Sequence, residues 1–203
     1  MHFTHVEHLS TVVEHGLMSD AGVHDAAMLS VEVGNLGIKD QRRHRAVPVQ
    51  PPGAVSDFVP FYFGPRSPMM YAIAQGNVPS YQGGTSRLIY LVTTLDRLHE
   101  LGYGPILTDR NAALEYAAYR EFDPSDPIDD GFIDWELMEA RYWNDFDDGR
   151  ERRMAECLVR DMVPWEAFIG VVAQNDVVAQ EAKLIAAGLG VEIDVRVRPQ
   201  WYF

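Results

Sequence analysis

One acidic residue stands out because of its neighbours. Glu156 follows Ala155 and precedes the apolar residues 157–159, so its carboxylate belongs to an apolar segment. Burying a carboxylate costs free energy unless the group is paired or takes part in chemistry. Beside a reacting carbon it would stabilise developing positive charge. The alternative is a structural ion pair, which the residues alone favour, and the cations close in sequence are Arg152, Arg153 and Arg160.

Basic residues form a second group that could do chemistry. Lys39, Arg42, Arg43 and Arg45 lie within seven positions, and Arg150, Arg152 and Arg153 form a later cluster. Acidic residues crowd between 121 and 148, and the net charge is −13. That balance argues against nonspecific nucleic-acid binding through counterion release. A local basic groove within an acidic shell can still hold a short single strand; the alternative is that both clusters are solvated surface.

Residues 59–71, VPFYFGPRSPMMY, indicate a short aromatic strand that runs into a helix. Ser67 and Pro68 are typical of a first helical turn. The free N–H groups there can meet an anion, with Arg66 beside them, which weakly indicates a phosphate-bearing ligand. Because side chains alternate along a strand, Tyr62 should face a cleft while Phe61 and Phe63 pack in the core.

The remaining pattern mixes strands and helices without a regular strand–helix–strand repeat, which favours an α+β fold. We expect strands at 88–92, 106–107, 168–173 and 191–197. We expect helices at 10–16 with Ser10 as N-cap, 95–101, 110–120 capped by Asp109, 134–143, 151–159 and 174–187. Residues 34–57 and 81–86 read as loops, the first of a length common in ligand loops.

Composition sets the broad class. A chain of 203 residues with 47% hydrophobic content predicts one domain spanning residues 1–203. No apolar run approaches the roughly eighteen residues of a membrane span, and there is no apolar signal core. The single Cys157 excludes an internal disulfide and favours a cytoplasmic location. Motifs of Rossmann oxidoreductases, P-loop NTPases and G-x-S-x-G hydrolases are absent.

Several segments, taken together and in order, resemble the DarT family of DNA ADP-ribosyltransferase toxins. They are residues 2–5, 38–43, 59–71, 108–113, 142–144, 152–156 and 199–202. The resemblance implies an ADP-ribosyltransferase fold with a split central β-sheet flanked by helices. It implies mono-ADP-ribosyl transfer from NAD to a base, most simply thymine, in single-stranded DNA. It further implies a toxin–antitoxin system whose partner is a macrodomain antitoxin of the DarG type.

The resemblance also assigns the two catalytic residues. Glu156 lies in the family's R-x-A-E-x-L-V setting, where the carboxylate holds a ribose hydroxyl and faces the charge that develops as the nicotinamide–ribose bond breaks. Arg42 follows Ile38 in an I-x-x-x-R run, with Arg43 as the alternative one residue away. A guanidinium stays protonated in proteins, so we expect Arg42 to orient the diphosphate and stabilise a base anion.

Further site residues follow from the same resemblance. The expected NAD-binding residues are His2, Thr4, Thr11, Arg42, Tyr62 and Ser67. The expected DNA-binding residues are Arg43, Met69, Met70, Tyr71, Asn111 and Arg153. Asn111 departs from the family, which often has His there, and this leaves its role in reading a base open. His2, His5 and His8 share a spacing of three but lack a recognised metal-ligand partner, so no metal is expected.

Two alternatives of other kinds stay open at this point. The chain could be a degenerate module that binds NAD or nucleic acid without turnover. It could also be an ADP-ribosyltransferase that acts on guanine, RNA or protein. The presence of both Arg42 and Glu156 favours an enzyme, because a pure binder has no need of a carboxylate facing a ribose.

Overall fold

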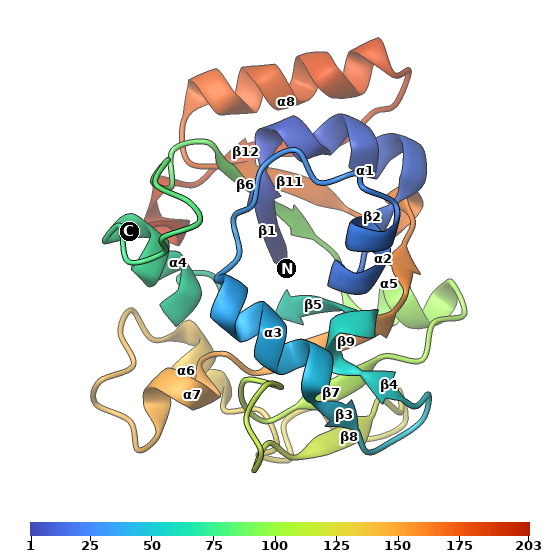
Figure 1. Ribbon diagram of the computed structural model, residues 1–203, viewed down its shortest axis with the longest axis vertical. Helices are drawn as coiled ribbons and strands as arrows, with labels where there is room; N and C mark the ends of the chain where they lie inside the picture. Colours follow the sequence, from blue (N-terminus) through green and yellow to red (C-terminus); the bar gives the residue numbers. More distant parts are fainter.

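The computed structural model describes residues 1–203 and contains two four-stranded sheets (Figure 1). The first sheet has the order β1-β6-β11-β12, and only its β11–β12 pair is parallel. Its strands are β1 (His2–His5), β6 (Leu88–Val92), β11 (Gly170–Ala173) and β12 (Val195–Val197).

The second sheet has the order β5-β9-β7-β8 and is antiparallel throughout. Its strands are β5 (Phe58–Tyr62), β9 (Glu156–Arg160), β7 (Ile106–Thr108) and β8 (Tyr119–Glu121). Two short ribbons complete the β-structure: β2 (Leu17–Met18) with β10 (Met162–Val163), and β3 (Ala46–Val47) with β4 (Gly53–Ala54).

The two sheets meet where the chain begins. The Met1 nitrogen donates to the Tyr62 carbonyl at 2.8 Å, and the Tyr62 N–H donates to the Met1 carbonyl at 2.8 Å. These two bonds place β1 of one sheet beside β5 of the other. The α+β class and the split central sheet are therefore confirmed.

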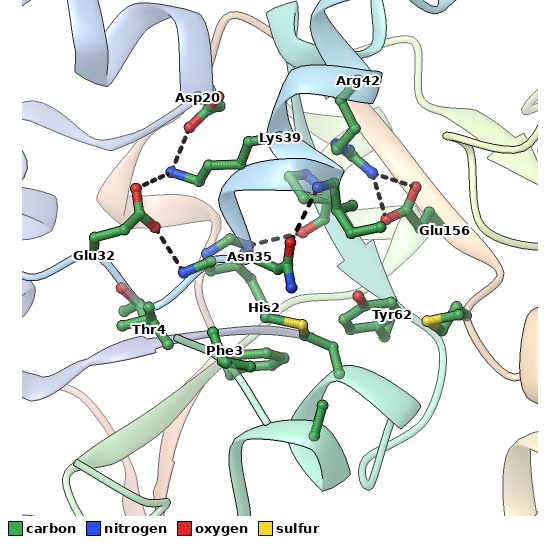
Figure 2. A pocket seen from close by; sticks show the side chains of 18 of the residues that line it. His2, Phe3, Thr4, Asp20, Glu32, Asn35, Lys39, Arg42, Tyr62 and Glu156 are labelled. Carbon is green, nitrogen blue, oxygen red and sulfur yellow. Dashed lines mark hydrogen bonds and ion pairs between the residues drawn. The ribbon is translucent and has the colours of Figure 1, made fainter. Parts of the chain in front are cut away.

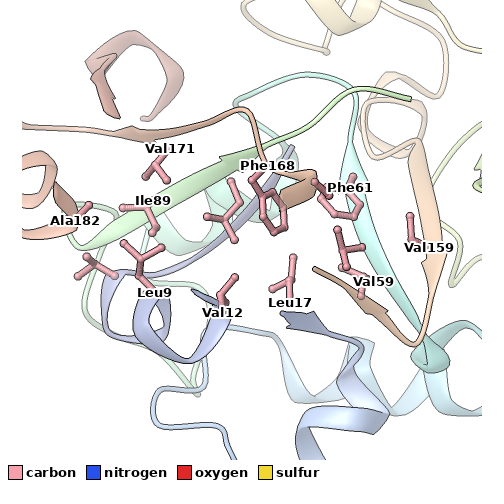
Figure 3. Close-up of a cluster of buried hydrophobic side chains, with 14 of the residues drawn as sticks. Leu9, Val12, Leu17, Val59, Phe61, Ile89, Val159, Phe168, Val171 and Ala182 are labelled. Carbon is pink, nitrogen blue, oxygen red and sulfur yellow. The ribbon is translucent and has the colours of Figure 1, made fainter. Parts of the chain in front are cut away.

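Two helices cover the first sheet. α1 (Leu9–His15) and α8 (Asp176–Gly188) lie side by side above it in Figure 1. α8 begins at Asn175, whose side chain accepts from the Val178 N–H at 3.0 Å, and it buries a face of small and apolar residues, Val178, Ala179, Ala182 and Ala186. Figure 3 shows the main core, in which α1, both sheets and α8 contribute side chains such as Leu9, Val59, Phe61, Ile89 and Ala182.

Six further helices lie elsewhere in the fold. They are α2 (Asp20–Asp25), α3 (Leu36–His44), α4 (Pro68–Ala74), α5 (Leu95–Glu100), α6 (Trp135–Glu139) and α7 (Gly149–Arg152). Four single 3-10 turns are η1 (Val6–His8), η2 (Val55–Asp57), η3 (Trp165–Ala167) and η4 (Pro199–Trp201). None of the helices combines the length and apolar character that a membrane crossing requires.

The expectation of a loop over residues 34–57 is wrong, because this stretch contains helix α3. The Asn35 side chain caps it by accepting from the N–H groups of Gly37 and Ile38. The only residue that α3 buries is Arg42. Because the buried side chain of this helix is a cation, its sequence has no regular spacing of apolar residues. Predictions from hydrophobic spacing therefore do not find α3.

Two expected helices are also wrong. After Asp109 the chain forms a turn that Asp109 closes by accepting from the Ala118 N–H at 2.8 Å, and β8 then begins at Tyr119. The segment 151–159 divides into the end of α7 and strand β9. β9 pairs on both edges, with β5 and β7, and that pairing overrides the helical pattern.

Other expectations match with adjusted ends. The strand at 88–92 is confirmed as β6, and Ser67 caps α4 by accepting from the Met70 N–H at 3.2 Å. α1 ends before Gly16 as expected but begins at Leu9, with His8 rather than Ser10 at the N-cap. The strand expected at 191–197 is confined to Val195–Val197, and the one at 168–173 begins at Gly170.

Candidate active site

A cavity of about 850 Å³ lies at the split between the two sheets. Its walls come from β1, α1, the segment 28–35, α3, β5, α4 and β9, with further residues from 142–154. Figure 2 shows Arg42 and Glu156 on one side of this cavity, and Thr4, Phe3 and His2 on the floor. Segments that are far apart in sequence thus share one cavity.

Arg42 and Glu156 form a buried pair on the cavity wall. The Arg42 Nη1 donates to Glu156 Oε1 at 2.9 Å and to Oε2 at 3.0 Å. The Ala112 N–H donates to Oε2 at 3.2 Å. Burial would lower the pKa of Arg42, but the adjacent Glu156 carboxylate outweighs it and raises that pKa. Arg42 is therefore a permanent cation, and its buried Nη2 has no hydrogen-bond partner.

Tyr62 is placed beside Glu156 by the register of β5 and β9, which sets these residues directly opposite each other. Opposed residues in an antiparallel pair point to the same face, so both line the cavity. The next pair, Phe61 and Cys157, points to the other face and joins the core. Burial raises the pKa of Cys157 to about 12, so this thiol is a packing group.

A set of hydrogen bonds behind the wall holds Glu156 in place. The Glu156 N–H donates to the Thr108 hydroxyl at 3.0 Å, and that hydroxyl donates to the Arg110 carbonyl at 2.7 Å. The Tyr119 hydroxyl donates to the Ala112 carbonyl at 2.6 Å. Sequence reasoning missed these residues, because their importance depends on strand pairing that local patterns do not reveal.

The histidines of the cavity are neutral and have fixed tautomers. His2 Nδ1 lies 2.8 Å from the Pro60 carbonyl, which can only accept, so Nδ1 carries the proton and Nε2 is an acceptor. Burial lowers the pKa of His2 to about 4. His8 Nε2 accepts from the Val31 N–H at 3.1 Å, and its Nδ1 donates to the Thr4 hydroxyl at 2.7 Å. The Thr4 hydroxyl is therefore free to donate to a ligand.

The wall opposite β1 is held by an ion network around Lys39. Its Nζ lies 2.6 Å from Asp20 Oδ1 and 2.7 Å from Glu32 Oε2 (Figure 2). Arg43 also approaches Asp20, at 3.4 Å, and stays largely exposed without lining the cavity. Of the basic cluster, Arg42 and Lys39 face the cavity, and Lys39 is already neutralised by two carboxylates.

Three residues expected in the site take structural positions instead. Ser67 is 1% exposed and caps α4, and Met70 is 0% exposed within the core. Arg153 is 3% exposed and donates to the carbonyls of Pro65, at 2.6 Å, and Leu137. None of the three lines the cavity. Their burial leaves no surface with which to contact a ligand, so we assign them to the support of the fold.

Other expected residues do lie at the cavity. His2, Thr4, Thr11, Arg42, Tyr62 and Glu156 line it, as do Met69, Tyr71 and Asn111. The Asn111 side-chain oxygen accepts from the Ala113 N–H at 3.0 Å, and its amide nitrogen donates to the sulfur of Met154, another cavity residue, at 3.9 Å. Within residues 1–203, no group of three or more His, Cys, Asp or Glu side chains is arranged to hold a metal ion.

A buried arginine–glutamate pair, a tyrosine beside it and neutral histidine and threonine side chains in a sheet split are consistent with the ADP-ribosyltransferase class. Comparisons with known proteins agree. The chain superposes with a TM-score of 0.90 on the structure described as Thermus sp. 2.9 DarT in complex with ADP-ribosylated ssDNA. The match has 29% identity and covers 100% of this chain and 94% of the other. The same protein in complex with NAD⁺ gives 0.86, covering 100% and 96%.

The sequence comparisons define the family. The family model described as "ssDNA thymidine ADP-ribosyltransferase, DarT" matches residues 1–203, and the chain belongs to this family. A DNA ADP-ribosyl transferase of Thermus sp. (strain 2.9) is 33% identical over 205 residues, covering 100% of this chain and 94% of that protein. A DNA ADP-ribosyl transferase–DNA ADP-ribosyl glycohydrolase fusion protein of Thermosipho africanus is 25% identical, covering 90% and 44%.

Proposed function

We propose that this protein transfers ADP-ribose from NAD to the thymine base of single-stranded DNA. Membership of the DarT family supports the reaction class. The assignment of the reaction to particular residues rests on one observation. Arg42 and Glu156 contact each other in the wall of one cavity that is large enough for a dinucleotide. NAD is a substrate here, consumed in the reaction.

The reaction breaks the bond between nicotinamide and ribose and forms a bond from the ribose carbon to a thymine ring nitrogen. Thymine N1 already carries the deoxyribose, so the acceptor is N3, which releases its proton. N3 is the atom that pairs with adenine, and the base must therefore be unpaired to react. The products are the modified base, nicotinamide and a proton.

Glu156 is suited to stabilise the positive charge that develops on the ribose. An ionised carboxylate offers about four acceptor positions. Arg42 and Ala112 occupy three of them, two on Oε2 and one on Oε1. The remaining position on Oε1 is available for a ribose hydroxyl. Tyr62, on the same face of the sheet, closes this part of the cavity.

Arg42 is suited to hold negative charge, because it cannot act as a base. Its Nη1 is engaged by Glu156, whereas its buried Nη2 has no partner in the protein. An unpaired buried donor is costly, and an oxygen of the NAD diphosphate or of a thymine anion would satisfy it. His2 and Thr4, with their acceptor nitrogen and donor hydroxyl, are suited to a carboxamide on the opposite side.

The test is incubation with NAD labelled in its adenylate moiety and oligonucleotides that contain one thymine. Mass spectrometry should find one ADP-ribose on the thymine of the single strand and none on the paired duplex. An oligonucleotide in which N3-methylthymine replaces thymine should not react. Tight NAD binding without nicotinamide release would contradict the proposal and favour a binding module. Transfer to guanine, RNA or protein would show that the acceptor is not thymine.

The proposal also covers the biological role of the protein, its partner and its location in the cell. The family resemblance supports a role as the toxin of a toxin–antitoxin pair. The Thermosipho africanus relative is named as a fusion with a DNA ADP-ribosyl glycohydrolase, which supports a macrodomain antitoxin of the DarG type as partner. A reaction that needs both NAD and DNA would take place in the cytoplasm, with residues 1–203 acting as one domain. Co-purification with the product of a neighbouring gene would test the partner.

A further inference from the structure

Four aromatic side chains gather at one end of the cavity. Tyr71, Trp143 and Phe203 contact one another edge to face, with ring centroids 5.0 to 6.0 Å apart. Tyr142 lies beside them, since the Arg66 guanidinium approaches both its ring and that of Phe203. We refer to Tyr71, Tyr142, Trp143 and Phe203 as the aromatic platform.

The aromatic platform is continuous with the site already described. Tyr71 belongs to α4, while Tyr142 and Trp143 lie between α6 and α7. These three residues line the same cavity as Glu156 and Asn111. Tyr71 is 41% exposed and Tyr142 is 51% exposed, so their ring surfaces are open to solvent beside the cavity. Trp143 is half-buried and also packs against the core cluster that contains Leu137, so it anchors the platform while the two tyrosine rings are open.

A fixed cation accompanies the rings. The Arg66 guanidinium lies 4.0 Å from the Phe203 ring centroid and 5.6 Å from that of Tyr142. Its Nη1 donates to the Tyr202 carbonyl at 2.7 Å, while its buried Nε has no partner. The backbone of Arg66 has φ +59°, a strained conformation for a residue other than glycine. Arg150 adds a second cation among the cavity residues.

Exposed aromatic rings next to arginines are the combination that binds the bases and backbone of a single strand. In a chain of net charge −13, the guanidinium groups of Arg66 and Arg141, at 5.6 and 5.5 Å from the Tyr142 ring centroid, give the platform two cations that suit phosphate. A duplex would not fit this arrangement, because its bases are stacked on each other and offer no free face.

We propose that the aromatic platform is the subsite for the nucleotide next to the reacting thymine, with that neighbour's base stacked on Trp143 and Tyr142. This inference rests on the proposed function. It adds that affinity for DNA comes in large part from the neighbour and not from the thymine alone. The stacking is tolerant of base identity, so any of the four bases at that position should serve.

The first experiment removes the neighbouring base from the DNA. Oligonucleotides with a single thymine are prepared with an abasic site on its 5′ side, on its 3′ side, or on neither. Base–aromatic stacking amounts to about 1–3 kcal/mol per base, which corresponds to about 5- to 150-fold. We expect kcat/KM for the oligonucleotide to fall by such a factor for one of the two abasic sites.

The second experiment removes the platform. Trp143→Ala and Tyr142→Ala should lower kcat/KM on the intact oligonucleotide and should abolish the difference between intact and abasic DNA. The Kd for NAD, measured by titration calorimetry, should not change. Leu184→Ala is the matched control, because Leu184 is an exposed apolar residue on α8 outside the cavity. Tyr142 is more than half exposed, so its variant should fold even if Trp143→Ala does not.

The outcomes separate this inference from the proposed function. Transfer that is indifferent to both abasic sites would overturn the subsite. So would variants that fold, bind NAD and remain as sensitive to the abasic site as the unmodified protein. Absence of transfer to every oligonucleotide, including the intact one, would instead contradict the proposed function itself.

Discussion

Arg42 and Glu156, 114 residues apart in sequence, contact each other through a single guanidinium nitrogen that lies 2.9 Å from one carboxylate oxygen and 3.0 Å from the other. Both side chains are buried, at 10% and 3% exposure. The geometry leaves the second guanidinium nitrogen and one acceptor position of the carboxylate for substrate. The pair is thus neutral as a unit and still presents one donor and one acceptor.

Replacing Glu156 by Gln should separate the effect of the negative charge on the transfer rate from the effect of side-chain shape. Gln keeps the volume and can still accept from the Ala112 N–H, but it cannot face a ribose cation with negative charge. We expect the transfer rate to fall by about 100- to 1,000-fold, the range for loss of one electrostatic group in a protected site. NAD binding should change little. Rates are measured with saturating NAD and a thymine oligonucleotide, and a variant with unchanged kcat would exclude the role assigned to Glu156.

Breaking the pair from one side should destabilise the fold. Arg42→Met leaves the Glu156 carboxylate buried with Ala112 as its remaining donor, and the expected loss is about 3–5 kcal/mol of unfolding free energy. The double variant Arg42→Met with Glu156→Leu should recover most of that stability while remaining inactive. Denaturant unfolding of the single and double variants provides the cycle. A double variant as unstable as the single would show that the pair itself stabilises the protein.

Tyr119 should act as a positioning residue. Its hydroxyl fixes the Ala112 peptide, whose N–H holds Glu156 Oε2. Tyr119→Phe removes one hydrogen bond, worth about 0.5–1.5 kcal/mol, so kcat should fall by about 2- to 12-fold with the KM for NAD unchanged. Tyr116→Phe is the control, because Tyr116 is 59% exposed and its hydroxyl donates to the side chain of Glu151, away from the Arg42–Glu156 pair. Equal losses in both variants would remove the specific role of Tyr119.

His2 should titrate far below an ordinary histidine. Its pKa is lowered from 6.5 to about 4, first by burial and then by nearby cations, with the Pro60 carbonyl opposing the shift. Because the unfolded chain binds the proton more readily, unfolding free energy is lost as pH falls from 6.5 towards 4. NMR of the histidine ring signals should find one resonance that moves only near pH 4. A His2 resonance that titrates near pH 6.5 would contradict the neutral tautomer deduced above.

Met69 and Met70 provide a matched pair. Met70 is 0% exposed in the core, whereas Met69 lines the cavity. Met70→Ala should cost about 2–5 kcal/mol of stability. Met69 is half-buried against the same core cluster, so Met69→Ala should cost less, about 1 kcal/mol, and should raise the KM for the oligonucleotide. Thermal unfolding and kinetics on the two purified variants test this prediction. A larger loss of stability in Met69→Ala than in Met70→Ala would show that Met69 is the core residue.

The strand alternation of residues 59–62 could be read from the sequence, and so could the orientation of Tyr62; Phe63 lies beyond the end of β5 and is only half-buried. Two-residue alternation is local, and the structure places Tyr62 at the cavity and Phe61 in the core. The capped start of α4 was equally predictable, because Ser67 and Pro68 encode it locally. The same local rules could not show that Ser67 and Met70 are fully covered, since their burial depends on neighbours from distant segments.

α3 shows the limit of sequence reasoning most clearly. Its buried residue is an arginine, and that burial is stable only because Glu156 arrives from β9. No pattern within residues 36–44 contains this information. The Lys39 network with Asp20 and Glu32 has the same character, since each partner looks like an ordinary surface charge in isolation. Thr108 and Tyr119 became visible only through strand pairing.

The two backbone hydrogen bonds between Met1 and Tyr62 carry a mechanical implication. They set how far His2 stands from Tyr62 and Glu156 without any contribution from side-chain identity. Mutations of the side chains that line the cavity can therefore change substrate preference, while these backbone bonds keep the distance between β1 and β5 constant.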